Sequence, residues 1–226
     1  MKQARDILLK IYQNLYHHFG PLHWWPGDTP WEIMVGAVLT QNTNWNNVVK
    51  AIHNLKRENL LNPFALYQLE ESKLASLIKS SGYYKVKARR LKNLVNFLVE
   101  NYQGKESLMF KEKDEDLREK LLSIKGIGPE TADSILLYAG NKPFFVVDSY
   151  TRRIFSRHKL ISQAATYKQI QDFFTQNLDH EVKLFNEFHA QIVMLGKTIC
   201  KNNNPSCQVC PLKFLEEEKY LIKGNN

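Results

Sequence analysis

Apolar side chains recur at intervals of three and four residues along most of the chain, which is the spacing of one face of an α-helix. The segment Thr29-Pro30-Trp31-Glu32 predicts a helix start, with a capping box and a proline in the first turn. Apolar residues then follow at helical spacing as far as Leu39. After a polar stretch at 41–44, a second amphipathic pattern runs from Trp45 to Leu55 and predicts a second helix.

Further helices are expected along the rest of the chain. The pattern places them at 74–78 with a stop at Gly82, at 88–98 with an end near Gly104, at 116–124, from Pro129 to about Gly140, after Asp148, and at 185–199. Strand signal is scarce. The run Phe144-Phe145-Val146-Val147 is apolar and short, but no partner run is in view, so we interpret it as a buried connection. The predicted fold class is all-α.

Composition and charge narrow the class of protein. The 226 residues suffice for one or two packed units, and 43% hydrophobic residues exclude a disordered chain. A net charge of +8 favours a polyanion such as nucleic acid as the partner. No apolar run approaches the roughly 20 residues of a membrane span, and the charged first ten residues are unlike a signal peptide, so we expect a cytoplasmic protein.

The most informative segment is 121–132, Leu-Leu-Ser-Ile-Lys-Gly-Ile-Gly-Pro-Glu-Thr-Ala. An apolar helix ends, a Gly-Ile-Gly turn follows, and a new helix opens with Pro129. Glycines permit a tight turn and a close approach of the backbone, and the amides at a helix start suit a phosphate. An ordinary tight connection between two packed helices is the alternative interpretation.

Four motifs in order resemble those of the helix-hairpin-helix DNA glycosylases, the endonuclease III superfamily. They are Leu39-Thr40-Gln41-Asn42-Thr43, the segment 82–88 (Gly-Tyr-Tyr-Lys-Val-Lys-Ala), the hairpin followed by Val146-Val147-Asp148-Ser149-Tyr150, and three C-terminal cysteines. The resemblance covers roughly residues 20 to 212, and within the superfamily the 3-methyladenine DNA glycosylase III branch is the most similar in motif.

The resemblance implies two helical domains. A six-helix barrel with the hairpin would span 22–140, and residues 1–21 with 141–226 would form the second domain. Double-stranded DNA containing damaged bases would be the partner, with the flipped base held between the domains, and the enzyme would associate with the nucleoid. Nothing in the sequence indicates an oligomer interface, so we expect a monomer.

The family's catalytic aspartate corresponds to Asp148. Excision of a base develops positive charge on the sugar, which a carboxylate stabilises, and the same group can orient or deprotonate water. A purely structural alternative is that Asp148 caps the helix beginning at Ser149. Both roles are compatible.

Some relatives carry a lysine four residues beyond the first hairpin glycine, and its amine forms a Schiff base that leads to strand cutting. Here that position is Glu130, which cannot form a Schiff base. The resemblance therefore implies a monofunctional glycosylase that leaves an abasic site. A neighbouring Lys125 or Lys197 could supply weak lyase activity, and as structure alone Glu130 is a favourable acid in a helix first turn.

A base pocket is expected from aromatic side chains, since an enzyme that acts on a base must flip it out and hold it. By resemblance the candidates are Trp24, Trp25, Pro26 and Trp45, with Lys197 near the pocket. Alkylated purines can be cationic, and tryptophan faces attract cations. Packing in the core is the alternative for each tryptophan.

DNA contacts are expected from the hairpin and from an aromatic and basic strip. Gln41 and Tyr83 correspond to family positions that fill the gap left by the flipped base and wedge the opposite strand. The full set of predicted DNA-binding residues is Gln41, Tyr83, Lys85, Lys87, Lys125, Gly126, Ile127 and Gly128. A solvated basic helix face is the alternative for the lysines.

The spacing Cys200-x6-Cys207-x2-Cys210 resembles the iron–sulfur loop of the superfamily. The family's fourth cysteine is missing, because Glu216 stands at its place. Three cysteines could hold a [4Fe–4S] cluster with Glu216, Glu217 or water as the fourth ligand. Zinc with a histidine, or no metal, are the alternatives.

These features predict a monofunctional DNA N-glycosylase of base excision repair that removes an alkylated, 3-methyladenine-like base. One alternative is an endonuclease III-like glycosylase and lyase acting on damaged pyrimidines or mismatches. A non-catalytic helix-hairpin-helix DNA-binding module is the other, and Asp148 argues against it because a pure binder gains nothing from a carboxylate beside phosphates.

Overall fold

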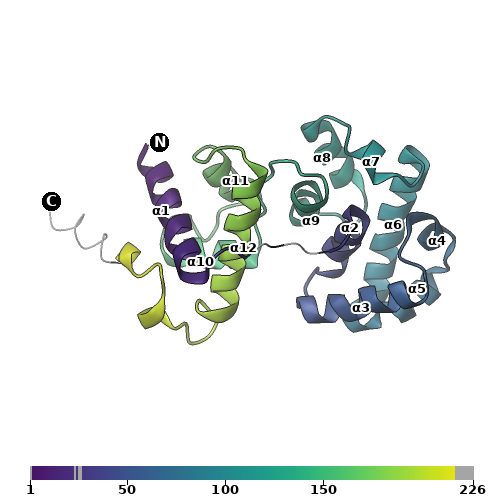
Figure 1. Ribbon diagram of the computed structural model, residues 1–226, viewed down its shortest axis with the longest axis horizontal. Helices are drawn as coiled ribbons and strands as arrows, with labels where there is room; N and C mark the ends of the chain where they lie inside the picture. The colour runs from purple at the N-terminus through teal and green to yellow at the C-terminus, as the bar shows by residue number, and fades with distance from the viewer. Residues whose placement is uncertain (1, 23, 25–26, 217–226) are drawn as a thin grey trace. The chain divides into compact units, whose positions relative to one another are not determined.

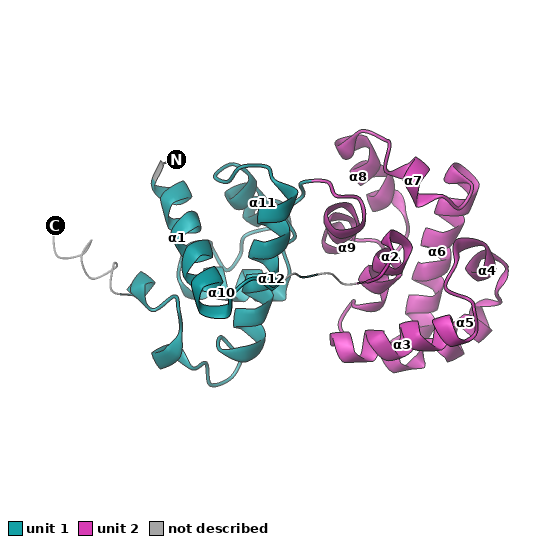
Figure 2. Ribbon diagram, viewed as in Figure 1, with its two compact units in different colours: residues 1–24, 143–226 teal, residues 25–142 magenta. Residues whose placement is uncertain are grey.

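The computed structural model describes residues 2–22, 24 and 27–216, and in these residues every regular element is helical (Figure 1). The all-α prediction is therefore confirmed. The chain forms two compact units, one from residues 1–24 and 143–226 and the other from residues 25–142 (Figure 2). The domain bounds expected from the resemblance stay a prediction. In the described part of the chain, no helix combines the length and apolar character that a membrane span requires.

The unit of residues 25–142 is a sequence of short helices around one long one. Its elements are α2 (Pro30–Leu39), α3 (Trp45–Arg57), α4 (Pro63–Gln68), α5 (Glu71–Leu77), η1 (Lys79–Ser81), α6 (Tyr84–Tyr102), α7 (Glu106–Met109), α8 (Asp114–Ser123), α9 (Pro129–Ser134) and the π-helical turn η2 (Ile135–Ala139). Helix α6 packs against α2, α4 and α5. Its buried face includes Leu91, Leu94, Val95 and Leu98, as the apolar spacing predicts.

The other unit joins the two ends of the chain. It contains α1 (Lys2–Phe19), α10 (Ser149–Arg157), α11 (Tyr167–Thr175), α12 (Val182–Thr198) and η3 (Cys207–Val209). Both α1 and α10 pack against α12. The core is aromatic: the rings of Phe145 and Phe174 stack with centroids 3.8 Å apart, and Phe185 and Phe188 meet Phe145 edge-on.

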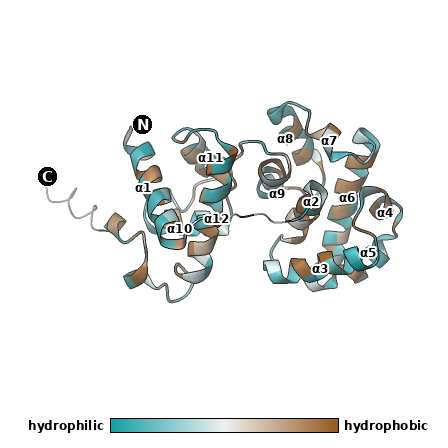
Figure 3. Cartoon of the chain, viewed as in Figure 1, coloured by the Kyte–Doolittle hydropathy of each residue, from teal (hydrophilic) through white to brown (hydrophobic). Residues whose placement is uncertain are grey.

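Local signals in the sequence set several of the helix ends. Thr29 caps α2 by accepting the Glu32 amide at 3.1 Å, and Asn44 caps α3 in the same way. Gly82 ends η1 with a φ of +69°, a value that favours glycine. The run Phe144–Val147 is buried and forms no strand, so its interpretation as a buried connection is confirmed. Figure 3 shows hydrophobic and hydrophilic positions alternating along the helices, consistent with one buried face each.

Candidate active site and DNA-binding hairpin

Asp148 lies at the N-cap of α10, where one carboxylate oxygen is fully engaged. Its Oδ1 accepts the Thr151 amide at 2.7 Å and the Thr151 hydroxyl at 3.0 Å. The predicted capping role is therefore observed. The second oxygen, Oδ2, has no part in the cap and lies 3.6 Å from Nε2 of His189. Only 12% of the Asp148 side chain is exposed, so the carboxylate is held rigidly with one oxygen directed away from its own helix.

His189 on α12 is the main site residue that the sequence analysis missed. Its side chain is buried and faces Asp148. Burial by itself would raise the pKa of Asp148, but His189 and the two Thr151 donors outweigh burial and hold that pKa below its ordinary value. Asp148 is therefore ionised at neutral pH. The signal in the sequence was helical spacing, because His189 precedes Lys197 by eight residues and both lie on one face of α12.

Lys197 and Trp24, both predicted pocket residues, meet in the structure. The Lys197 ammonium lies 5.2 Å from the centroid of the Trp24 ring, within the range of a cation–π contact. Burial lowers the pKa of Lys197, and the charge of Asp148 opposes that shift in part. Trp24, Asp148 and Lys197 thus belong to one unit and one neighbourhood. The predicted residues Trp25 and Pro26 lie outside the described residues.

The close approach of α10 and α12 depends on Gly196. A Cβ at this position would lie 2.3 Å from Cδ1 of Tyr150, which is in the first turn of α10. Because Tyr150 is two residues from Asp148, the glycine sets the distance between the carboxylate and α12. A glycine inside the apolar stripe was the available signal in the sequence.

The hairpin between α8 and α9 is held from within by α6. Asn93 donates to the Lys125 carbonyl at 2.8 Å, so the Gly126 amide of the same planar peptide points away from α6. Gly126 has a φ of +98°, and a Cβ there would lie 2.3 Å from Cγ of Arg90. Only glycine fits this position. Ile127 is buried, whereas Lys125 is exposed.

Gln41 connects the end of α2 to the hairpin. Its Nε2 donates to the Gly126 carbonyl at 3.1 Å and to the Thr131 hydroxyl at 2.9 Å, while its Oε1 accepts from Arg90 at 2.5 Å. Both ends of the amide are therefore used inside the protein. For Gln41 to fill the gap left by a flipped base, these hydrogen bonds would have to break or be shared.

Tyr83 is an exposed aromatic side chain at the start of α6. It is 72% exposed and has a left-handed backbone with a φ of +46°, directly after Gly82. A non-glycine residue in this region is strained, and strained residues concentrate at functional sites. Its rigid position at the start of α6 suits the wedge role expected from the resemblance.

The basic residues after Tyr83 are not all exposed to solvent. Lys87, which was expected to bind DNA, is buried. That residue is 1% exposed, and its ammonium donates to the carbonyls of Leu39 at 2.8 Å and Ser81 at 2.5 Å. Burial, followed by the charge of Arg90, lowers the pKa of Lys87 to about 8. The ammonium is therefore unavailable to a phosphate. It ties together the two segments that carry Gln41 and Tyr83.

Lys92, a further basic residue of the same helix, also has internal partners. Lys92 donates to three carbonyls at the end of α4, those of Leu66, Tyr67 and Leu69, and so caps that helix. Lys85 is exposed, and its contact to DNA stays a prediction.

Trp45 and Glu130 occupy defined places in the unit of residues 25–142. The Trp45 ring packs on α2 at Gly36, where a Cβ would lie 3.2 Å from its Cη2. It is half-buried, so packing accounts for part of its surface and leaves part accessible. Glu130 is exposed in the first turn of α9, next to the hairpin.

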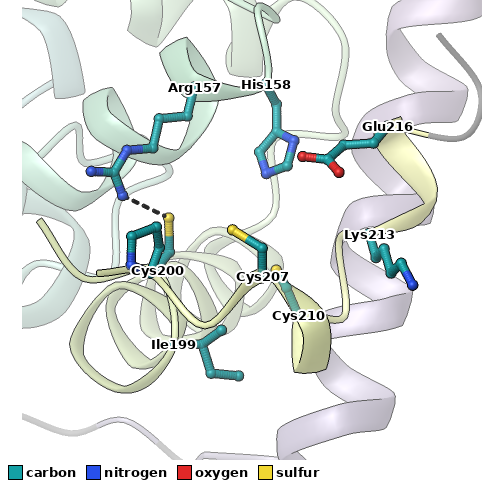
Figure 4. Close-up of a pocket in the computed structure, with 9 residues that line it drawn as sticks. Arg157, His158, Ile199, Cys200, Cys207, Cys210, Lys213 and Glu216 are labelled. Atoms are coloured by element: carbon teal, nitrogen blue, oxygen red, sulfur yellow. Dashed lines mark hydrogen bonds between the residues drawn. The ribbon is translucent and has the colours of Figure 1, made fainter. Parts of the chain in front are cut away.

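The three cysteines line one cavity of about 200 Å³ (Figure 4). All three lie in the described chain, and none forms a disulfide. Arg157 donates to Sγ of Cys200 at 3.4 Å and to the next two carbonyls of the loop, and burial raises the pKa of Cys210. His158 and Glu216 also line the cavity.

This donor set fits a cluster better than a single ion. Among residues 2–22, 24 and 27–216, no three histidine, cysteine or acidic side chains are close enough together to hold one metal ion. A zinc ion at about 2.3 Å from each sulfur would need sulfurs about 3.8 Å apart. A four-iron cluster spaces its ligands further apart, and three thiols around a shared cavity suit that arrangement.

Comparison with known sequences identifies relatives along nearly the whole chain. Residues 35–180 match the family described as HhH-GPD superfamily base excision DNA repair protein. A Methanocaldococcus jannaschii protein named as a DNA repair glycosylase is 46% identical over 215 residues, covering 94% of this chain and 97% of the relative. Endonuclease III of Thermotoga maritima is 31% identical over 184 residues, covering 81% of each.

Solved structures agree in fold. The Helicobacter pylori 3-methyladenine DNA glycosylase MagIII, bound to 1,N6-ethenoadenine, is 31% identical with a TM-score of 0.71, covering 86% of this chain and 97% of that one. An endonuclease III–DNA covalent intermediate has a TM-score of 0.81 at 21% identity, covering 96% and 98%. At that identity the second likeness bears on the fold alone.

Proposed function

Because the chain belongs to the HhH-GPD superfamily of base excision DNA repair proteins, we propose that it is a monofunctional DNA N-glycosylase for alkylated purines. Its partner is damaged double-stranded DNA. The observation that carries the proposal is the buried, ionised Asp148, with one oxygen fixed by Thr151 and the other facing His189. The reaction class is hydrolysis of the bond between base and sugar.

Asp148 acts chiefly through its charge. A general base works best when its pKa is near the operating pH, and the contacts of Asp148 lower its pKa instead. A fixed negative charge with a low pKa is suited to stabilising the positive charge that develops on the sugar as the base departs. Water that attacks the sugar would be oriented by the same carboxylate.

The absence of a lysine at the Schiff-base position supports hydrolysis without strand cutting. Glu130 occupies that position at the start of α9, and a carboxylate cannot condense with the sugar aldehyde. The abasic site is therefore the expected product. Lys197 is the candidate amine for any residual lyase activity, because its pKa is lowered by burial and it interacts with Asp148.

A preference for alkylated purines is supported by two observations. The chain covers 97% of the Helicobacter pylori 3-methyladenine DNA glycosylase at 31% identity, and that protein binds 1,N6-ethenoadenine. In this chain, the Trp24 ring lies within cation–π distance of Lys197, so a cationic base would have to displace that ammonium or stack on the other ring face. A cationic alkylated purine is attracted by such a face, and it is also a good leaving group that needs little acid catalysis.

We also propose that Cys200, Cys207 and Cys210 hold a [4Fe–4S] cluster. When bound, the cluster would fix the conformation of the segment after α12, which lies against the C-terminal end of α10. Arg153 and Arg157 of α10 already donate to backbone carbonyls of that segment, those of Cys200, Lys201 and Asn202. Since Asp148 begins α10 and Arg157 ends it, a fixed C-terminal end helps to hold the catalytic carboxylate in place.

The test is excision from duplex oligonucleotides that carry 1,N6-ethenoadenine or 3-methyladenine, with oxidised pyrimidines and mismatched thymine as competitors. Strands cut only after alkali treatment would support a monofunctional enzyme. Cutting without alkali, together with a borohydride-trapped adduct, would favour the endonuclease III-like lyase instead.

The variant Asp148→Asn separates catalysis from capping. Asparagine caps a helix as well as aspartate does, so α10 should remain folded. We expect excision to fall by about 100-fold or more, as when one electrostatic group is removed from an active site, with DNA affinity retained. Unchanged excision would remove Asp148 from the mechanism.

A further inference from the structure

The cysteine cavity has a nitrogen donor that the cysteine spacing does not reveal. His158 follows Arg157 as the C-cap residue of α10, 42 residues before Cys200 in the sequence numbering. In Figure 4 its imidazole points into the cavity that is lined by the three sulfurs and by Glu216. The fold therefore brings a fourth and a fifth potential ligand to a loop that lacks the family's fourth cysteine.

The backbone at His158 is fixed from two sides. Its amide is bonded to the carbonyls of Ile154 and Ser156 in the last turn of α10. The preceding Arg157 donates to Sγ of Cys200 and to the carbonyls of Lys201 and Asn202. The backbone of His158, from which the imidazole extends, is therefore held at a set position relative to the cysteine loop.

Charge favours the histidine over Glu216 as the ligand. Around a [4Fe–4S] core of charge +2, three thiolates with a carboxylate would leave a net charge of about −2, whereas three thiolates with a neutral imidazole would leave about −1. Uncompensated buried charge is costly, and Arg157 is the cation that contacts a sulfur among the described residues. Imidazole nitrogen is a good ligand for iron, and histidine replaces cysteine at the iron of Rieske centres.

Glu216 then has a different part. Ligating histidines almost always donate their other ring N–H to a carboxylate or carbonyl, which fixes the ring and its tautomer. The Glu216 carboxylate lies beside the His158 ring in the same cavity. The residue at the place of the fourth cysteine would thus orient the substitute ligand.

We propose that His158 is the fourth ligand of a Cys3His [4Fe–4S] cluster in which Cys200, Cys207 and Cys210 are the other three, and that Glu216 is a positioning residue for the imidazole. This inference rests on the cluster proposed above. The proposed fourth ligand lies at the C-terminal end of α10, far from the cysteine loop in sequence.

The experiment uses the full chain, isolated without oxygen and reconstituted with ferrous iron and sulfide. Iron, sulfide and zinc content, visible absorption and the pulsed EPR spectrum of the reduced protein are measured after labelling histidine with ¹⁵N. The variants are His158→Ala, His158→Cys and Glu216→Gln, with His53→Ala as the control because His53 is exposed on α3. Circular dichroism checks that each variant folds.

We expect the unmodified chain to hold iron and sulfide in the ratio of a [4Fe–4S] cluster, with a hyperfine coupling from histidine nitrogen. His158→Ala should lose iron, His158→Cys should keep the cluster but lose the nitrogen coupling, and Glu216→Gln should keep the cluster with an altered coupling. His53→Ala should match the unmodified chain in every respect.

Two results would overturn the inference in different ways. A chain that binds a full cluster without nitrogen coupling, and whose cluster survives His158→Ala, would leave the cluster proposal standing and exclude His158 as the ligand. A chain that binds only zinc or no metal after reconstitution would remove both the cluster and its ligand. Base excision is measured separately, so neither result depends on catalytic activity.

Discussion

At the scale of single residues, the pair Asp148–His189 determines how the candidate site responds to pH. The groups that face the carboxylate are His189 and Lys197 from α12 and Thr151 from α10. Burial raises the pKa of Asp148, but His189 and Thr151 outweigh it and hold that pKa below its ordinary value. Activity that requires the ionised carboxylate therefore persists as pH falls, until the pH reaches this lowered pKa.

Replacing His189 with glutamine should move the acid side of the pH–activity profile to higher pH. Glutamine can still donate a hydrogen bond but carries no positive charge, so the charge contribution of His189 that lowers the pKa of Asp148 is lost and the carboxylate protonates earlier as pH falls. The rate of excision above the new pKa should change much less. The measurement is kcat/KM for excision against pH, with His53→Gln as the matched control on an exposed face. If kcat/KM fell by the same factor at every pH and the acid side of the profile did not move, His189 would have only a structural role.

Lys85 and Lys87 are two residues apart but differ in burial, so we expect one to contribute to DNA binding and the other to stability. Lys87→Met should lower the free energy of unfolding by roughly 1–3 kcal/mol, because the carbonyls of Leu39 and Ser81 lose their donor. Lys85→Met should leave stability within about 0.5 kcal/mol of the parent and weaken DNA binding, with the salt dependence reduced by about one phosphate contact. Denaturant unfolding and DNA titrations at several salt concentrations measure both effects. If Lys87→Met reduced the salt dependence of DNA binding and Lys85→Met lowered stability, the roles inferred from their burial would be wrong.

At the scale of elements, the hairpin between α8 and α9 is a turn that α6 and the end of α2 hold in place. Asn93, Arg90 and Gln41 occupy its inner side. A contact between the hairpin backbone and phosphate would fix the register on DNA without reading sequence. Only one of its two glycines, Gly126, is required by backbone conformation and packing, whereas Gly128 has open space around it. The two positions can therefore be compared by the same substitution.

Gly126→Ala should destabilise the unit of residues 25–142 by roughly 1–3 kcal/mol, because a positive φ and a contact at 2.3 Å with Arg90 both oppose a Cβ. Gly128→Ala meets nothing within 4 Å and has an ordinary φ of −94°, so it should cost at most about 1 kcal/mol. Thermal unfolding measures the stability of both. If the Gly128 backbone approaches phosphate, the second variant should still bind duplex DNA less tightly. Equal stability of the two variants would show that the turn can relax around the Arg90 side chain.

At the scale of the whole molecule, a net charge of +8 governs association with DNA. If the protein contacts about six to ten phosphates, affinity for an undamaged duplex should fall roughly 10³- to 10⁵-fold between 50 and 200 mM salt. Binding isotherms over that range measure the slope, and the same osmolarity supplied by sucrose is the control. Affinity that is independent of salt would argue against binding through the phosphate backbone.

The sequence alone determined the helices, the hairpin and the family resemblance. These depend on local rules: apolar spacing, a threonine or asparagine before a helix, and glycines where φ is positive. Gly82, Gly126 and the Asp148 cap were predictable because each requirement is confined to a few neighbouring residues. The motif order around Asp148 carried the prediction of a glycosylase.

Only the tertiary structure decided which polar side chains face solvent and which face one another. Lys87 and Lys85 are alike in the sequence, but the end of α2 buries only the first. His189 meets Asp148, and His158 joins the cysteines, through contacts between helices that are far apart along the chain. Helical spacing could place His189 on the same face of α12 as Lys197. It does not encode which residues of other helices that face meets, because side-chain burial and ligand sets depend on long-range packing.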